Sequence, residues 1–310
     1  MVCLALLVGF AAPALALSPK QMESLLEESS SYARDALGKA EEAPAGKRRE
    51  MYDAIIARID QDMALCTDAK AELLADWGDL YVELAKETSN DIAFVFLDKA
   101  LPIFEKARDR DRKEEHAWTG LAEVHHVRAE KLYEAGQEEE ARKQAEQGFA
   151  VFKEGEKYCP NSNFLYYMWG SNLVLRAYDV EGAERRDLRL EGIAKFARAA
   201  EIEPDDQYAL RMAGTANLRM AEDISGESAE RTRLLREAES WYKKAFVHDP
   251  DGTCRPLAEA QALLQDENSL RATLEQCARR DRLPDLDKEP FNFVRTKDWF
   301  RKLAALENGQ

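Results

Sequence analysis

Side chains suited to catalysis or metal binding are scarce in this chain of 310 residues, which holds four histidines and five cysteines. His116 and His126 lie ten residues apart on one predicted helix, too far apart to chelate one ion along a helix face. The sequence contains neither a CxxC nor an HxxxH pair, so it does not match a zinc site. It also lacks a G-x-S-x-G elbow, a Cys–His signature and a G-x-x-x-x-G-K phosphate loop. We therefore predict a protein that is not an enzyme and that uses no metal or cofactor.

The cysteines favour a structural role. Cys254 begins the predicted helix CRPLAEAQALLQ, and Cys277 lies near the end of the next one, NSLRATLEQCARR, with a turn at residues 265–267 midway between them. In an antiparallel helix pair these two ends meet, so a Cys254–Cys277 disulfide is sterically allowed if the Cα atoms come within roughly 7 Å of each other. The sequence alone does not decide whether this bridge forms. Cys66 and Cys159 are expected to be buried as small hydrophobic residues.

Acidic residues outnumber basic ones, with 59 Asp and Glu against 44 Lys and Arg, and the formal net charge is -15. Such a surface repels phosphate backbones, which argues against a nucleic-acid partner. Glycine (15 residues) and proline (10 residues) are both sparse for this length. Because few residues break helices, the composition favours long helices over many short strands.

The first 17 residues, MVCLALLVGFAAPALAL, contain no charged side chain and end in the small-x-small triplet Ala14, Leu15 and Ala16. An apolar run followed by such a triplet is typical of a cleaved export signal, and this run is too short for a good transmembrane span. No Lys or Arg precedes the run, so an uncleaved anchor stays as the alternative. We expect export to the periplasm of a Gram-negative bacterium, with no membrane span once the signal is removed.

An aromatic residue recurs with a period of about 46 residues: Phe104, Phe152, Phe196 and Tyr242 are spaced 48, 44 and 46 residues apart. A small residue precedes each by four positions, and a proline follows the last three by eight. These are Ala100, Gly148, Gly192 and Ala238, followed by Pro160, Pro204 and Pro250. The small residue and the aromatic residue share one helix face, and the proline ends that helix.

A second pattern precedes each copy. It consists of a large residue, a second residue three positions later that is large in three of the four copies, and a small residue directly after that. Its copies are Leu74, Trp77 and Gly78; Trp118, Leu121 and Ala122; Tyr166, Trp169 and Gly170; and Leu210, Ala213 and Gly214. Large residues at this spacing form an apolar stripe, and the small residue lets a second helix approach closely. Each unit is therefore predicted to be a helix hairpin that buries its apolar face by stacking on its neighbours.

These spacings resemble the W-x2-L-G-x2-Y…A-x3-F…P pattern of the tetratricopeptide repeat (TPR) family over residues 70–252. The resemblance implies an all-α, right-handed solenoid of antiparallel helix hairpins. The two small residues of a unit are 22, 26, 22 and 24 residues apart here, against about twelve in the family. We expect the additional residues to lengthen both helices of each hairpin by about one or two turns.

The predicted organisation has four parts. They are an export signal (1–17), an N-terminal helical cap (18–67), four TPR-like repeats (68–252), and a C-terminal helical hairpin with a capping tail (253–310). The cap is expected to begin with Ser18 as N-cap and Pro19 as first helical residue. The tail carries large apolar residues that either close the array or dock on a partner: Phe291, Phe293, Trp299, Phe300 and Leu303.

In TPR proteins the first helix of each unit lines a concave binding face, so the resemblance implies that a partner protein or peptide binds there. Tyr167 is expected to point either into the neighbouring unit or into a ligand groove. The candidate residues beside the apolar stripe are His116, Thr119, Glu123 and His126; Tyr167, Ser171 and Asn172; and Tyr208, Arg211 and Thr215.

These features predict an exported, non-enzymatic scaffold for protein–protein interaction. The alternative is a periplasmic TPR-type accessory component of a solute transporter, which binds a small ligand or a solute-binding protein. Neither the identity of the partner nor the oligomeric state is encoded in a motif of this sequence.

Overall fold

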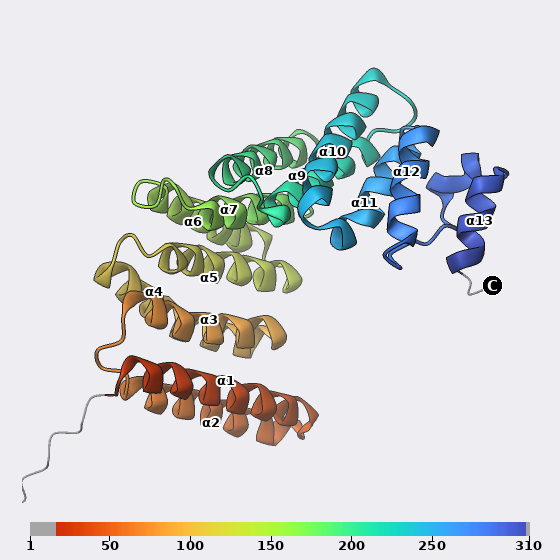
Figure 1. Ribbon diagram of the computed structural model, residues 1–310. Coiled ribbons are helices and arrows are strands. Elements are labelled where there is room, and N and C mark those ends of the chain that lie inside the picture. Colours follow the sequence, from red (N-terminus) through yellow and green to blue (C-terminus); the bar gives the residue numbers. More distant parts are fainter. Residues whose placement is uncertain (1–16, 308–310) are drawn as a thin grey trace, which may run out of the picture. The chain divides into compact units, whose positions relative to one another are not determined.

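The computed structural model describes residues 17–307 and divides the chain into two compact units, residues 1–151 and 152–310. Every regular element within residues 17–307 is a helix (Figure 1). The predicted all-α class is therefore confirmed. The predicted export signal, apart from Leu17, lies outside the described residues.

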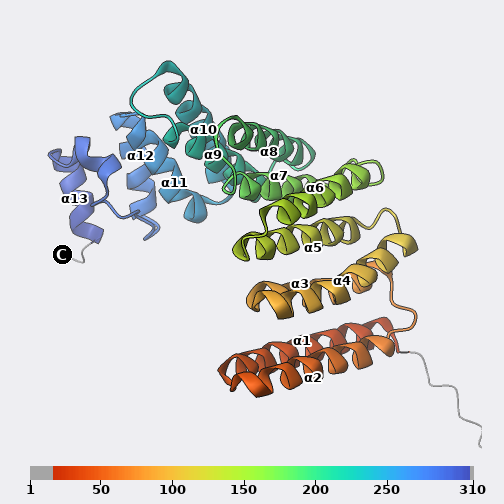
Figure 2. The same ribbon diagram turned by 180° about the vertical axis from the view of Figure 1, so that it is seen from behind.

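The first unit is a stack of helix hairpins. Its helices are α1 (Pro19–Glu42), α2 (Ala45–Ala64), α3 (Ala71–Glu87), α4 (Asn90–Arg110), α5 (Glu115–Glu134) and α6 (Glu138–Gly155), of which α6 runs across the division between the units. α1 and α2 lie side by side in both views (Figures 1 and 2), and α1 also packs against α3. α3 packs against α4 and α5, so the hairpins bury one another's apolar faces.

The second unit, taken by itself, is also built of packed helix hairpins. Its helices are α7 (Asn163–Arg176), α8 (Gly182–Ile202), α9 (Gln207–Glu222), α10 (Ala229–His248), α11 (Pro250–Leu263), α12 (Glu267–Ala278), the short 3-10 helix η1 (Glu289–Val294) and α13 (Asp298–Glu307). Consecutive helices from α7 to α12 pack against each other. Pro250 is the first residue of α11, so the proline that was predicted to end the fourth repeat also begins the next helix.

Polar residues at the starts of the helices accept from backbone N–H groups that have no partner within the helix. Gln21 Oε1 accepts from the backbone N–H of Ser18 at 2.9 Å, and Pro19 is the first residue of α1, as predicted. Asp206 Oδ1 accepts from the backbone N–H of Tyr208 at 2.9 Å at the start of α9. These local bonds explain why the helices begin where they do.

The additional residues of each unit do not lengthen both helices of every hairpin. α7 has 14 residues, whereas its partner α8 has 21. A 34-residue TPR unit already accommodates two helices of about the length of α7. The prediction is therefore wrong for α7, because the additional residues lie in α8 and in the connection at residues 177–181.

A glycine of the first helix contacts an aromatic ring of the second helix in three hairpins. All three rings are fully buried. Because glycine has no Cβ atom, the backbones of the two helices approach each other more closely than they could with any other residue at this position. The pairs are Gly78 with Phe104, Gly170 with Phe196 and Gly214 with Tyr242, and a Cβ atom on the glycine would lie 2.7, 2.8 and 2.6 Å from the nearest ring atom.

Phe104 also joins two successive hairpins. Its ring lies against Gly78 of α3 and against Gly120 of α5. The repeat pattern assigned the small position of this unit to Ala122, so it did not identify Gly120. One buried ring thus fixes the distances between three helices.

The C-terminal tail closes the second unit. Phe291 and Phe300 are buried in a cluster with Leu270 and Leu274 of α12. Cys254 and Cys277 form a disulfide that joins α11 to α12, with their Cα atoms 5.8 Å apart. Cys66 and Cys159 are buried and take no part in a disulfide, in keeping with a packing role.

Replacing Gly78 by Ala is expected to lower the midpoint of thermal unfolding, because the added methyl group meets the buried ring of Phe104. Overpacking of this kind costs about 1–3 kcal/mol. Gly38→Ala is the matched control: Gly38 lies inside α1 of the same unit, and nothing lies within 4 Å of its added Cβ atom. Calorimetry should show a lower midpoint for the first variant and an equal or higher one for the control. Equal midpoints would contradict the close approach.

Replacing both Cys254 and Cys277 by Ser is expected to lower the free energy of unfolding of the second unit by about 3 kcal/mol, since the bridge spans a sequence separation of 23. Urea unfolding with and without a reductant measures this effect. The reductant should destabilise the wild-type chain and leave the double variant unchanged. A wild-type chain that does not respond to the reductant would show that the bridge is absent.

Candidate functional site

The predicted partner-binding residues lie on α5 in the first unit and on α7 and α9 in the second. These three helices are first helices of hairpins, and α3 is another first helix of the first unit. α3 packs against α5, and α7 packs against α9. The first helices of one unit are therefore neighbours, and we call their outward side the first-helix face of that unit. The predicted residues divide into an exposed set and a set that the fold uses for packing.

In the second unit, the structure brings Tyr167, Tyr208 and Arg211 together. The ring centroid of Tyr167 is 6.0 Å from that of Phe196 and 6.5 Å from that of Tyr208. The guanidinium carbon of Arg211 lies 5.4 Å from the centroid of Tyr208, which is 53% exposed. Tyr167 therefore packs towards the neighbouring repeat unit, which is the first of its two expected orientations. Tyr208 is the most exposed member of this cluster.

Arg211 and Thr215 are also bonded to the frame of the second unit. Arg211 Nη1 donates to Asp249 Oδ2 at 2.9 Å, and Asp249 is the N-cap of α11. Thr215 Oγ1 donates to the carbonyl of Arg211 at 3.0 Å and accepts from the hydroxyl of Tyr242 at 3.1 Å. Removal of either side chain would leave a polar group without its partner. Tyr208 is therefore the better residue to substitute when binding at this face is tested.

Of four other predicted residues, three are engaged within their own hairpins. Thr119 and Asn172 are buried, and each donates to the carbonyl one turn earlier in its helix, at 3.1 and 2.9 Å. The ring of His126 packs on Phe149, with the centroids 4.6 Å apart. Ser171 is half-buried, and its Oγ atom has no hydrogen-bond partner within residues 17–307. Partner binding by these four residues stays a prediction.

In the first unit, α3 carries an acidic stripe. Glu72, Asp76, Asp79 and Glu83 are spaced three and four residues apart and so share one helix face. Burial, together with the negative charges of Glu123, Asp76 and Glu83, raises the pKa of Asp79 to about 8. Burial also raises the pKa of Asp76. Asp79 therefore holds a proton at neutral pH.

The predicted residues Glu123 and His116 of α5 connect to this stripe. Lys86 of α3 forms an ion pair with Glu123. The charge of His116 favours ionisation of Asp76 and so opposes the effect of burial on its pKa. These contacts join α5 to α3 electrostatically, in addition to their packing.

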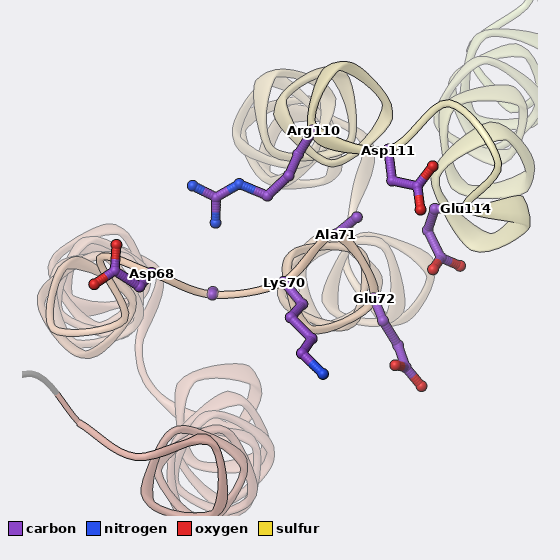
Figure 3. A pocket seen from close by; sticks show the side chains of 8 residues that line it. Asp68, Lys70, Ala71, Glu72, Arg110, Asp111 and Glu114 are labelled. Atoms are coloured by element: carbon purple, nitrogen blue, oxygen red, sulfur yellow. The ribbon is translucent and has the colours of Figure 1, made fainter.

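An open hollow of about 520 Å³ lies at the start of α3, beside the end of α4 (Figure 3). Its lining contains both acidic and basic side chains. Figure 3 shows that Lys70 and Arg110 point away from each other, while the carboxylates of Asp111 and Glu114 lie near one another. An active site needs groups that converge on one reacting atom. The charged groups drawn in this hollow diverge instead.

Groups that could perform chemistry are dispersed. Within residues 17–307, no group of three or more His, Cys, Asp or Glu side chains is placed to hold a metal ion. Burial lowers the pKa of His125, whose Nδ1 atom lies 3.0 Å from Gln144 Oε1. Burial raises the pKa of the Cys66 thiol, which makes it a poor nucleophile at neutral pH. No helix of the described part is both long and apolar enough to cross a membrane.

Sequence reasoning missed Asp76 and Asp79 as members of the first-helix face. Their spacing along a predicted first helix is a signal that the sequence does contain. The partial burial of Asp79 and the repulsion that it meets, however, depend on side chains that packing brings near, above all Glu123 of α5. Such a contact between helices has no local sequence signature.

The comparisons with known proteins concern the fold. No family model matches the chain, and no curated protein matches it. The solved structures that are similar include TTC0263, a thermophilic TPR protein of Thermus thermophilus, with 15% identity over 74% of this chain and 98% of that chain and a TM-score of 0.40. YrrB, a TPR protein with an unusual peptide-binding site, has 19% identity over 66% of this chain and 86% of that chain and a TM-score of 0.38.

A third similar structure is Nro1, a nuclear import adaptor, with 13% identity over 84% of this chain and 92% of that chain and a TM-score of 0.40. The TPR-like character of the present chain is seen directly in its packing. The glycines of the first-helix pattern meet the aromatic rings of the second-helix pattern, as in the contact between Gly170 and Phe196. The chain is therefore an all-α protein of TPR-like helix hairpins.

Replacing Asp79 by Asn is expected to stabilise the first unit by about 1–3 kcal/mol near pH 9. The pKa of Asp79 is about 8 in the folded chain and about 3.9 in an unfolded chain. The folded state therefore binds the proton more tightly, and wild-type stability falls as the pH rises from about 4 to about 8. Asn resembles the protonated acid in shape and removes this loss. Urea unfolding at about pH 5 and about pH 9 measures the effect.

The advantage of the Asp79→Asn variant over the wild-type chain should grow from the lower to the higher pH. Glu87→Gln is the control, because it neutralises an exposed carboxylate of the same helix. An advantage of the same size at both pH values, or in the control, would show that the burial of Asp79 is not its cause.

Proposed function

We propose that this protein is a non-enzymatic interaction scaffold that binds a protein or peptide along the first-helix faces. The observation that carries this proposal is the exposure of Tyr208, which is 53% exposed beside Tyr167 and Arg211. Tyr and Arg are enriched among the side chains that supply most of the binding energy at protein interfaces. Two of the three residues are already held by contacts within the unit, so their ordering costs little entropy on binding.

Charge supports a protein partner over a nucleic acid. The net charge of -15 opposes binding to a phosphate backbone. The acidic stripe on α3 belongs to the first-helix face of the first unit and adds negative charge there. We infer that both faces recognise side chains and backbone of another polypeptide.

We also propose that the protein acts after export from the cytoplasm. The disulfide between Cys254 and Cys277 supports this, because such bridges persist in oxidising compartments and are rare in the cytosol. A role as accessory component of a solute transporter is compatible with the same location and stays a prediction.

A photo-crosslinking amino acid in place of Tyr208 is expected to capture a defined partner in living cells, since this side chain points out of the first-helix face. Mass spectrometry of the crosslinked bands identifies the partner. Val247 is the matched control position: it is 74% exposed, on the second helix α10 of the same unit. Crosslinks at Tyr208 that are absent at Val247 would support the proposal.

The captured partner then serves in a binding assay with purified proteins. Tyr208→Ala should weaken its binding about tenfold or more, as expected for an interface residue that contributes over 1 kcal/mol. Val247→Ala should leave the affinity unchanged. Equal capture at both positions, or unchanged affinity of the Tyr208 variant, would refute the first-helix face as the binding surface.

A further inference from the structure

A second hollow, of about 360 Å³, lies in the second unit where α9 ends and where α8 and α10 begin. Residue 182, the first residue of α8, lines it and is a glycine with φ +61°, a backbone conformation that strains any side chain. Glycine allows this backbone turn at the start of α8, and nothing lies within 4 Å of a Cβ atom added there. The remaining lining residues are Arg185, Arg186, Arg189, Met220, Asp223, Ile224, Glu230 and Leu234.

Arg189 is buried, with 4% of its surface exposed, although guanidinium groups are costly to bury. It forms an ion pair with Asp223, and its guanidinium carbon lies 5.8 Å from the ring centroid of Tyr178. Its Nε atom is buried and has no hydrogen-bond partner within the described chain. A buried donor of a charged group without an acceptor is a costly feature, and it points to an acceptor supplied by a ligand.

Arg185 offers further donors at the same place. Its Nε atom donates to the carbonyl of Val180 at 2.7 Å, which leaves its two terminal nitrogens without a partner among the described residues. Arg186 differs, because it is paired with Glu230 at 2.7 Å. The hollow therefore contains Arg185, which is anchored and has available donors, and Arg189, which is buried and has an unused donor. The charge of the third arginine, Arg186, is neutralised by its ion pair.

The charges of the lining define the charge of the ligand. Three guanidinium groups face the two carboxylates Asp223 and Glu230, which leaves one net positive charge. The start of the long helix α8 adds a further attraction for a negative group. The apolar side chains Met220, Ile224 and Leu234 supply the rest of the lining. A single negative charge on a small apolar body matches this composition.

We propose that this hollow binds a small organic carboxylate. The carboxylate group accepts hydrogen bonds from Arg189 Nε and from the terminal nitrogens of Arg185, because guanidinium donors match the planar geometry of a carboxylate. The apolar part of the ligand lies against Ile224 and its apolar neighbours in the lining. This inference goes beyond the proposed scaffold function and does not depend on it.

Isothermal titration of the purified full chain with sodium acetate, butanoate and hexanoate, at constant ionic strength, tests the proposal. Affinity should rise along this series, since each buried methylene adds to binding. Arg185→Gln should weaken hexanoate binding about tenfold or more, as expected for the loss of charge-assisted hydrogen bonds. Arg233→Gln is the matched control: it removes an exposed arginine of α10 outside this hollow and should leave the affinity unchanged.

Arg185 is substituted in place of Arg189 because Arg189 is buried and its removal would disturb the fold. Circular dichroism and the thermal midpoint establish that the Arg185 variant is folded. The absence of saturable hexanoate binding to the wild-type chain up to about 10 mM would overturn the proposal, since a ligand of this size in a built site should bind more tightly than that. Equal binding by the Arg185 and Arg233 variants would overturn it as well. Tighter binding of inorganic phosphate than of hexanoate would refute the carboxylate assignment. Crosslinking at Tyr208 reports on the scaffold function separately.

Discussion

The close approach of a glycine to a buried aromatic ring sets the geometry of the hairpins. Phe104 illustrates it, because its ring lies against Gly78 and Gly120, and a Cβ atom at either position would collide with it. Because backbone encloses this ring on two sides, no void is left beside it, and the packing is as dense as in other protein interiors. The distance between α3, α4 and α5, and with it the orientation of their outward faces, follows from this contact.

Because the hairpins use one side of each first helix for this contact, the opposite side stays available. The two units use that side differently. In the second unit Tyr167 packs between neighbouring hairpins and supports Tyr208, whose ring is exposed. In the first unit the side chains are acidic, and the raised pKa of Asp79 shows that burial and repulsion are not fully balanced by Lys86. Aromatic contact and charge are thus distributed over separate surfaces.

The ends of the hairpins have a different chemistry from their faces. Asp206 caps α9 and Asp249 caps α11, so carboxylates there bond backbone groups of their own chain. At the start of α8 the arrangement is reversed, since arginines gather where a helix dipole is already positive. Such an excess of positive charge in a strongly acidic protein is the physical basis for assigning an anionic ligand to that hollow.

The sequence by itself determined the helical class, the hairpin period and three of the glycines that meet aromatic rings (Gly78, Gly170 and Gly214), because these depend on spacing along one helix. It also placed Cys254 and Cys277 where a bridge could form. Only the tertiary structure decided that Thr119 faces inward, that Arg211 bonds Asp249, and that Asp79 lies among other carboxylates. These features arise from contacts between helices, whose relative rotation and depth of packing are set by the complete set of side chains between them.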